Sequence, residues 1–288
     1  MYQQKQVVIF GEVLFDCFPS GDEVLGGAPF NVAWHLQAFG DKPKFISRIG
    51  NDDKGKFILN AMTKWGMDVH SIQSDPEHPT GRVEVTISNN EPQYEIVKNA
   101  AYDYIAKLND HTLSSNGILY HGSLALRNKQ PNSALDALYS QTYLPIFIDV
   151  NLRDPWWEKR NIETWLHRAR WAKLNENELN VLGFNHQDIK QSILAFQTQF
   201  QLEQVIVTRG ELGALVCTID YQFYHVTQPR IEHFIDTVGA GDAFTARYIH
   251  GLLCDEVIEK TIDAAQKFAI KVIGLRGAIS SDPDFYQL

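Results

Sequence analysis

The sequence contains few cysteines, and their positions give them no evident role. Its 288 residues include three, Cys17, Cys217 and Cys254, which are too few and too scattered for a disulfide framework or a zinc site. The odd count agrees with a reducing compartment. The ten histidines show no ligand spacing such as H-E-x-x-H, and we interpret His35 and His121 as structural residues.

Long apolar runs and basic clusters are also missing. No stretch approaches the ~18 apolar residues that a membrane-spanning helix needs, and "MYQQKQVVIFGEVLFD" lacks the apolar core and cleavage site of a signal peptide. A formal net charge of −9 without any Lys/Arg-rich run argues against nucleic-acid binding. The sequence therefore predicts a cytoplasmic protein that binds neither membranes nor nucleic acids, and that binds phosphate, if at all, at a local site.

Short β-branched runs alternate with longer segments whose apolar residues recur at helical spacing. Helices are expected over 29–40, 55–66 and 255–274, the first two ending at a glycine. Because several strand-like runs are apolar on both sides, they favour a mostly parallel central sheet with helices on both faces, an α/β fold that we expect to be one domain over 1–288. The expected strands are 7–10, 44–50, 117–123, 145–151, 171–176 and 204–210.

One region departs from this alternation of strands and helices. In residues 81–99, apolar and polar residues alternate on both sides of the polar "SNNEP" segment. That pattern is typical of an antiparallel hairpin with one covered face. The hairpin could form a lid or an edge of the molecule, and the sequence alone does not decide between them.

The segment "IDTVGAGDAF" (235–244) places small residues where a loop becomes an amphipathic helix. The first amides of a helix have no partner within the helix and lie at the positive end of its dipole, so Gly239, Ala240 and Gly241 form a candidate anion site. Asp242 follows in the first turn, where a carboxylate could accept the proton of an alcohol that attacks a phosphoryl group. A helix capped by Asp242, with glycines serving only the turn, explains the same stretch.

Two other glycine-loop interpretations fit poorly. "GAGDAF" lacks the third glycine of a dinucleotide fingerprint, which disfavours an NAD-dependent oxidoreductase. "GNDDKGKF" (50–57) has the P-loop spacing but places Phe57 where magnesium binding needs Ser or Thr. It also puts Asp52 and Asp53 where phosphates would lie, so we interpret it as a turn that caps the next helix.

The sequence resembles the ribokinase-type (PfkB) carbohydrate kinases, and within them the fructokinase-like members. The family's C-terminal signature is matched from Asp236 to Phe244, and its sugar-site signature resembles "GGAPFNVAWHLQAFG" (26–40). Further blocks occur in the family's order, so the resemblance covers nearly the whole chain. They are "GEVLFD" (11–16), "SRIGNDDKG" (47–55), "YHGSLAL" (120–126), "DVNLRDPWW" (149–157), "KLNENEL" (173–179) and "VTRGELGA" (207–214).

The resemblance implies a ribokinase-like fold and a sugar site. Asp242 would be the general base, and the amides of residues 239–241 would bind the phosphoryl group. Asp16, Gly27 and Asn31 match positions that line the family's sugar pocket. Arg153 matches an arginine placed near the substrate and the transferred phosphate, and it follows a strand whose carboxyl end should reach the ligand crevice.

The resemblance also implies ATP and Mg²⁺ as cofactors and adds a monovalent-cation site for K⁺. Asn175 and Glu178 match the N-x-x-E element, whose acid helps to hold Mg²⁺ through water. On sequence alone, "NENE" would also serve as a helix cap. The family's nucleotide site is matched by Thr208, Gly210, Gly213 and Gly241, and the stretches that hold the monovalent cation by Asp236, Thr237, Val272, Gly277 and Ser281.

The family further implies a small β lid, here formed by about 12–24 and 81–99, which would close over the sugar and could join two chains in a homodimer. The expected activity is ATP-dependent phosphorylation of a free sugar, with fructose favoured by the likeness of individual blocks. Kinases of adenosine, ribose, 2-keto-3-deoxygluconate and tagatose-phosphate share the scaffold and stay open as alternatives, as does a non-catalytic sugar-binding relative.

Overall fold

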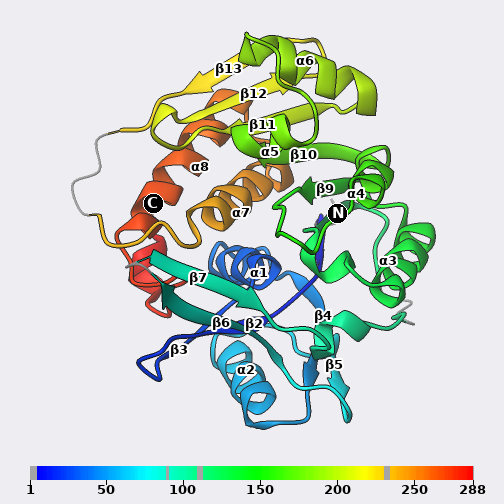
Figure 1. Ribbon diagram of the computed structural model, residues 1–288. Helices are drawn as coiled ribbons and strands as arrows, with labels where there is room; N and C mark the ends of the chain where they lie inside the picture. The colour runs from blue at the N-terminus through cyan, green and yellow to red at the C-terminus, as the bar shows by residue number, and fades with distance from the viewer. Residues whose placement is uncertain (1–4, 89–90, 109–112, 230–233, 288) are drawn as a thin grey trace.

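Two β-sheets organise the fold of the computed structural model, which describes residues 5–88, 91–108, 113–229 and 234–287 (Figure 1). The large sheet has nine strands in the order β13-β12-β11-β10-β9-β8-β1-β4-β5. All neighbours from β11 to β5 are parallel, which confirms the predicted mostly parallel sheet, whereas β12 and β13 add an antiparallel edge that the sequence did not indicate. Its strands are β1 (Gln6–Phe10), β4 (Lys44–Gly50), β5 (Ile72–Asp75), β8 (Gly117–His121), β9 (Ile146–Asp149), β10 (Ala169–Asn175), β11 (Gln204–Thr208), β12 (Ala214–Thr218) and β13 (Phe223–Val226).

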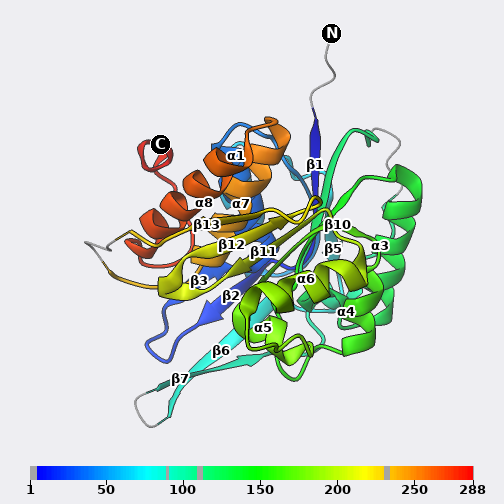
Figure 2. The same ribbon diagram turned by 90° about the horizontal axis from the view of Figure 1, so that it is seen from above.

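Helices cover both faces of the large sheet (Figure 2). The buried side chains of these helices fall into two clusters, one for each face. One face carries α1 (Ala28–Ala38), α2 (Asp53–Lys64), α7 (Ala240–Leu253) and α8 (Ile258–Ile273); the other carries α3 (Lys129–Thr142), α4 (Lys159–Leu166), α5 (Glu176–Val181) and α6 (Ile189–Phe200). Strand β1 shows why two cores form. Its successive side chains point to opposite faces, so Val7 and Ile9 join one buried cluster and Val8 and Phe10 the other.

The small sheet has the strand order β3-β2-β6-β7. It comprises β2 (Leu14–Cys17), β3 (Glu23–Gly26), β6 (Gly81–Ser88) and β7 (Glu91–Ile96). The antiparallel pairing of β6 with β7 confirms the predicted hairpin, and β2 joins β6 in parallel. The sheet extends past the carboxyl ends of the parallel strands, on the side away from the N-terminus (Figure 2). It therefore borders the edge of the large sheet where ligands of parallel α/β folds bind.

The turn at 50–57 is a helix start and no P-loop. Asp52 caps α2 by accepting the amide of Gly55 at 2.8 Å, and its second oxygen accepts the amide of Thr80 at 2.8 Å. A carboxylate fixed there leaves no place for a phosphate, which confirms the sequence interpretation.

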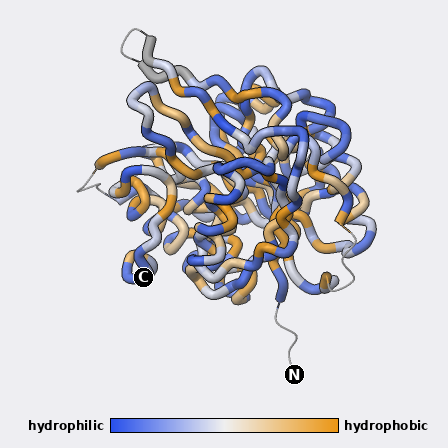
Figure 3. Tube along the Cα trace, turned by 90° about the horizontal axis from the view of Figure 1, so that it is seen from below, coloured by the Kyte–Doolittle hydropathy of each residue, from blue (hydrophilic) through white to orange (hydrophobic). Residues whose placement is uncertain are grey.

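His35 and His121 are fully buried, and burial lowers their pKa to about 3 and about 4. Both therefore stay neutral at physiological pH, as expected of structural histidines. Figure 3 shows hydrophobic and hydrophilic positions mixed along most helices, the pattern of helices with one buried face. Among the described residues, none of the helices has the length and hydropathy needed to cross a bilayer.

Four short 3-10 helices complete the described part of the chain. Of these, η2 lies beside the cavity described below and η3 follows β11. They are η1 (Ala101–Tyr104), η2 (Leu124–Leu126), η3 (Gly210–Leu212) and η4 (Pro283–Tyr286).

Candidate active site

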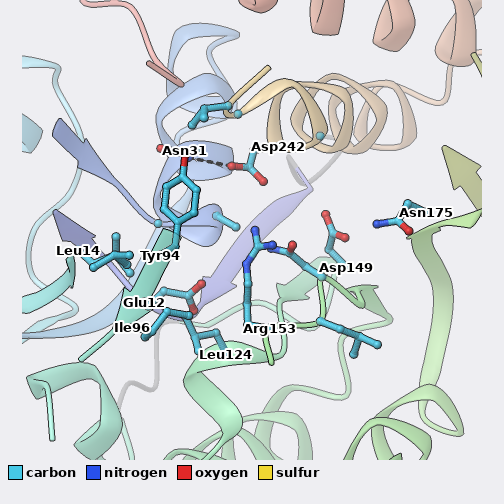
Figure 4. A pocket seen from close by; sticks show the side chains of 18 of the residues that line it. Glu12, Leu14, Asn31, Tyr94, Ile96, Leu124, Asp149, Arg153, Asn175 and Asp242 are labelled. Carbon is cyan, nitrogen blue, oxygen red and sulfur yellow. Dashed lines mark hydrogen bonds between the residues drawn. The ribbon is translucent and has the colours of Figure 1, made fainter. Parts of the chain in front are cut away.

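A cavity of about 590 Å³ lies between the carboxyl ends of the parallel strands, the N-termini of α1 and α7, and the small sheet (Figure 4). Its volume is that of a small-molecule site. The charged side chains that line it come from both sheets and from the loops after the parallel strands. They are Glu12, Asp16, Asp149, Arg153, Asp154, Lys173, Glu178 and Asp242.

The start of α7 forms one wall of this cavity. Gly239 is the N-cap residue with φ 79°, a left-handed conformation that favours glycine. A Cβ at this position would lie 2.3 Å from the Cβ of Ala278, so a side chain would also collide with the segment behind the loop. The backbone therefore turns here only because residue 239 is a glycine, and the turn points the first amides of α7 toward the cavity.

Three of these amides are available to a ligand. Within the described part of the chain, the backbone N–H groups of Gly239, Gly241 and Asp242 donate to no protein acceptor. The amide of Ala240 donates to the carbonyl oxygen of Thr237 at 3.2 Å, so the expectation that it belongs to the anion site does not hold in this structure. The other three donors, at the positive end of α7, form a candidate anion-binding wall.

Asp242 lines the cavity where the starts of α1 and α7 meet. Its Oδ2 accepts a hydrogen bond of 2.8 Å from Nδ2 of Asn31, drawn as a dashed line in Figure 4. Burial raises the pKa of Asp242 to about 6, although Asn31, Lys173 and Arg153 lower it. A carboxyl with this pKa is ionised at neutral pH and can still take up a proton, as a general base requires.

Gly27, the N-cap residue of α1, allows this approach. Its φ of 106° favours glycine, and a Cβ there would lie 2.9 Å from the carbonyl oxygen of Glu12. The turn brings Asn31 into the first turn of α1, where its side chain meets Asp242. The structure thus unites Gly27, Asn31 and Asp242, three residues that the sequence assigned to one site.

The end of the cavity next to the small sheet is acidic and partly apolar. Burial raises the pKa of Asp16, on β2, to about 6, and that of Glu12, between β1 and β2, to about 7. In both cases the charge of Arg153 acts in the opposite direction. Apolar side chains around these acids are Leu14, Val83, Ile96 and Leu124.

Arg153 projects into the cavity from the loop after β9 (Figure 4). Among the residues described, its guanidinium takes part in no hydrogen bond or ion pair, although its charge lowers the pKa of Glu12, Asp16 and Asp242. A planar cation without a protein partner can bind ligand oxygens in bidentate fashion. Arg153 thus lines the cavity at the carboxyl end of β9, and its role toward a ligand stays a prediction.

The opposite end of the cavity contains the N-x-x-E element. Asn175 and Glu178 form a capping box at the start of α5, each side chain bound to the other's backbone amide at 2.8 Å. The second oxygen of Glu178 accepts the amide of Leu152 at 2.8 Å. Each Glu178 oxygen thus accepts one protein donor and keeps a lone pair for another, so the element is both a helix cap and a polar cavity wall.

The nucleotide-site residues separate in the structure. Thr208, at the end of β11, lines the cavity, whereas Gly210, the first residue of η3, and Gly213, its C-cap, are absent from the lining. Both glycines have positive φ angles, 54° and 79°. A Cβ at Gly213 would lie 1.9 Å from the carbonyl oxygen of Val226, so this glycine allows the close approach of β13.

The segments expected to hold a monovalent cation meet at one corner. The amide of Asp236 donates to the carbonyl oxygen of Ile273 at 3.1 Å, next to Val272. Gly277 has φ 89° and precedes the residue that packs against Gly239. Thr237 lines the cavity, whereas Ser281 is exposed, and within the described part of the chain no hydrogen bond joins it to the other four.

Sequence reasoning missed Glu12, Asp149 and Lys173. Each is a charged residue within two positions of the carboxyl end of a buried strand, in "VVIFGE", "IFID" and "WAKLN". A charge in an otherwise apolar strand is costly to bury unless it is paired or functional, so this position was the available signal.

Comparisons with known proteins agree with this geometry. The model of the pfkB family carbohydrate kinases matches residues 5–284. The fructokinase of Escherichia coli is 25% identical over 298 residues, covering 96% of each chain. The fructokinase of Vibrio cholerae O395, in its fructose-, ADP- and calcium-bound form, superposes with a TM-score of 0.80 at 26% identity, over 96% of this chain and 94% of that one.

A double mutant of the Vibrio protein, in a fructose-, ADP- and potassium-bound form, gives a TM-score of 0.79 at the same identity and coverage. The aminoimidazole riboside kinase of Salmonella enterica, with aminoimidazole riboside and an ATP analogue, gives 0.84 at 22% identity over 98% of both chains. The chain therefore belongs to the pfkB family of carbohydrate kinases. It is an ATP-dependent carbohydrate kinase with a ribokinase-like fold.

Proposed function

We propose that the chain transfers the γ-phosphoryl group of ATP to a hydroxyl of a free sugar, with fructose as the preferred substrate and Asp242 as the general base. The observation that carries this proposal is the position of Asp242. Its carboxylate lines the cavity beside the unpaired amides at the start of α7, so a proton acceptor and a phosphoryl-binding site lie side by side.

The chemistry follows from these groups. Asn31 holds one oxygen of Asp242, and the other oxygen accepts the proton of the sugar hydroxyl as its oxygen forms a bond to phosphorus. The bond from phosphorus to the leaving ADP oxygen breaks in the same transfer. The amides of Gly239, Gly241 and Asp242 donate to the phosphoryl oxygens, which carry the charge of the transition state. Arg153 adds a planar cation at the sugar side of this group.

Mg²⁺ and ATP fit the opposite end of the cavity. Glu178 is a fixed carboxylate with spare lone pairs, suited to hold a hydrated Mg²⁺ through water. The described residues contain no group of three or more His, Cys, Asp or Glu placed to hold a metal ion directly. This agrees with a cation that keeps its waters and binds the phosphates, where it would neutralise charge.

The sugar would bind beside the small sheet. Asp16 has no hydrogen-bond partner within the described ranges and can accept from sugar hydroxyls, while Leu14 and Ile96 offer apolar contacts. We propose that the small sheet closes over the sugar as a lid, because β2, β6 and β7 all contribute to the cavity wall. Closure would exclude water, which otherwise competes as a phosphoryl acceptor.

Two observations favour a free ketose. First, among the described residues that line the cavity, only Arg153 and Lys173 are cationic, and Lys173 lies at the phosphate end, so a second phosphate on the sugar would find little positive charge. Second, two relatives at 25% and 26% identity are fructokinases, one of them solved with fructose. Adenosine, ribose and 2-keto-3-deoxygluconate are the competing substrates.

A coupled ADP-release assay over ketoses, aldoses and nucleosides tests this function. It is run with ATP and Mg²⁺, and with K⁺ or with a bulky organic cation in its place. The highest kcat/KM for fructose is expected, and a higher value for a nucleoside or an aldose would overturn the choice of sugar. Sugar binding without ADP release from any substrate would instead indicate a non-catalytic relative. Loss of turnover without K⁺ would support the monovalent-cation site.

A further inference from the structure

Lys173 is a buried lysine that lines the cavity. It lies on β10, its residue is 7% exposed, and its Nζ is 2.8 Å from Oδ2 of Asp149. The two residues are register partners on β9 and β10, and Asp149 is 1% exposed. A buried charge pair is costly to desolvate and gives little net stability, so its place in a ligand cavity calls for another explanation.

The ammonium group of Lys173 has donors to spare. Of its three N–H groups, one is needed for Asp149, and no other protein acceptor for Nζ occurs in the described part of the chain. Its position relative to the anion-binding wall is defined by Gly241, because a Cβ built on that residue would lie 3.5 Å from Nζ. The two remaining donors are therefore next to the amides at the start of α7.

Helix α7 is tied to the same pair. The hydroxyl of Thr245 lies 2.9 Å from Oδ2 of Asp149 and 2.9 Å from the carbonyl oxygen of Gly241. Thr245 is fully buried. Oδ2 of Asp149 thus contacts both the lysine on β10 and Thr245 on α7, so β9, β10 and the start of α7 together hold the ammonium in place.

We propose that Lys173 binds the γ-phosphoryl group of ATP from the side of Gly241, and that Asp149 and Thr245 are positioning residues for it. This inference rests on the proposed function and adds a catalytic cation to it. Lys173 stays protonated throughout and exchanges no bond. A cation fixed in a cavity with little water stabilises developing charge more than a mobile one on the surface. Gly241 leaves room for it to reach the phosphoryl oxygens.

Three variants separate this role from a structural one. Lys173→Gln removes the cation, Asp149→Asn removes its partner, and the double variant replaces the ion pair by two neutral amides. We expect Lys173→Gln to lower kcat about 10²–10³-fold, the scale for loss of one preorganised donor. The KM for sugar should change less than about threefold, because the lost contact is to the phosphoryl group. Lys260→Gln, an exposed lysine on α8, is the matched control.

The double variant, Lys173→Gln with Asp149→Asn, separates the effect on stability from the effect on turnover. Lys173→Gln alone leaves Asp149 buried without its cation, so thermal stability should fall and should recover in the double variant. Turnover should stay low, because no cation returns. Recovery of both stability and turnover in the double variant would show that the pair is only structural and would overturn the proposal.

The pH profile gives a second readout. Asp242 is surrounded by Asn31 on α1, Asp149 on β9, Lys173 on β10, Arg153 after β9 and Glu12 after β1. Removing Lys173 takes away a nearby positive charge, so the acid limb of kcat should move to higher pH. In the double variant the negative charge of Asp149 is removed as well, and the limb should move back. An unchanged limb in Lys173→Gln would contradict a cation at this position.

Measuring nucleotide affinity tests the role of Lys173 independently of whether any sugar is phosphorylated. By calorimetry without sugar, Lys173→Gln should bind ATP at least about tenfold more weakly than wild type, with ADP affinity little changed. This result would stand even if no sugar in the panel were phosphorylated. Equal losses for ATP and ADP, or no loss for either, would overturn the contact with the γ-phosphoryl group. Wild type that turns over no sugar would refute only the proposed function.

Discussion

The polar side chains at the two ends of the cavity differ in how many hydrogen-bond partners they have within the protein. At the phosphate end, Lys173 is paired with Asp149, and Asn175 with the Glu178 segment, all at 2.8 Å. At the sugar end, Asp16 and Arg153 have no hydrogen-bond partner among the described residues, and one oxygen of Glu12 is buried without one. The side chains of the phosphate end are thus held in place by internal bonds, which leave the spare donors of Lys173 and the amides of α7 for the ligand, whereas the side chains of the sugar end have no such internal partners.

This difference explains how one scaffold can serve many sugars. Phosphoryl transfer demands the same charges at the same places in each reaction, so their positions are fixed by internal bonds. A sugar is recognised by its hydroxyls, and buried groups that lack a partner reject ligands that cannot supply one. The comparison predicts that changes at the phosphate end affect kcat, and that changes at the sugar end affect KM.

Asp242 stands where the two ends meet, and its replacement should have the largest effect. Asp242→Asn keeps the size and the contact to Asn31 but removes the proton acceptor, so kcat should fall about 10²–10⁴-fold. Sugar affinity, measured by calorimetry, should stay within about threefold of wild type. Near-normal turnover would remove Asp242 from the chemistry.

Asp16 tests the sugar end. Asp16→Ala removes a carboxylate that can accept hydroxyl hydrogen bonds, each worth about 1.5–3 kcal/mol with a charged partner. We expect the KM for sugar to rise roughly 10–100-fold, while the KM for ATP stays nearly constant. Steady-state kinetics with each substrate varied separately measure this. A rise in the KM for ATP alone would reverse the assignment of the two ends.

The pH dependence sharpens the assignment of the base. Asp242 has a pKa of about 6 and must be ionised to accept a proton. Turnover should therefore be constant above this pH and fall about tenfold per unit below it. The kcat for the best sugar, measured from pH 4.5 to 8, checks this. Because Asp16 has the same pKa of about 6, an acid limb that survives in Asp242→Asn would point to that residue.

Glu12 should show the smallest effect, on stability. Burial raises its pKa from 4.5 to about 7, so the folded state binds the proton more tightly than the unfolded state. Its contribution to stability is therefore lost as the pH rises from 4.5 through 7. Relative to wild type, Glu12→Gln should gain on the order of 1–3 kcal/mol of unfolding free energy between pH 5 and pH 8. Urea unfolding at both values measures this, with exposed Glu259→Gln as control.

Much of the fold followed from local sequence signals. The strand-like run at 44–50 coincides with β4, and the apolar spacing after Ile258 predicts α8, because periodicity reflects which face is buried. The antiparallel edge of β12 and β13 escaped prediction, although β12 is a buried apolar run of the same length as β11. The expected homodimer through the small sheet stays a prediction.

Part of the candidate site could also be predicted from local sequence signals. Asp242 was predicted because the acid, the small residues before it and the start of the helix are adjacent in the sequence. Lys173 and Asp149 were not, because their pairing spans 24 positions and exists only once β9 and β10 are aligned. The engagement of the Ala240 amide with Thr237 also lay beyond prediction, since it depends on the turn's actual geometry.

The contact between Gly239 and Ala278 places the segment from Ala278 to Tyr286 directly against the loop that opens α7. That stretch is anchored by the bond from Nε1 of Trp34 to the carbonyl oxygen of Ser280, 2.8 Å, and by the contact of Tyr286 with His35, 3.1 Å. If these anchors loosen on mild warming, the loop loses its backing while both sheets stay intact. Heat inactivation would then begin in the segment from Ala278 to Tyr286. Enzyme that still has its full secondary structure by circular dichroism would already have lost its activity.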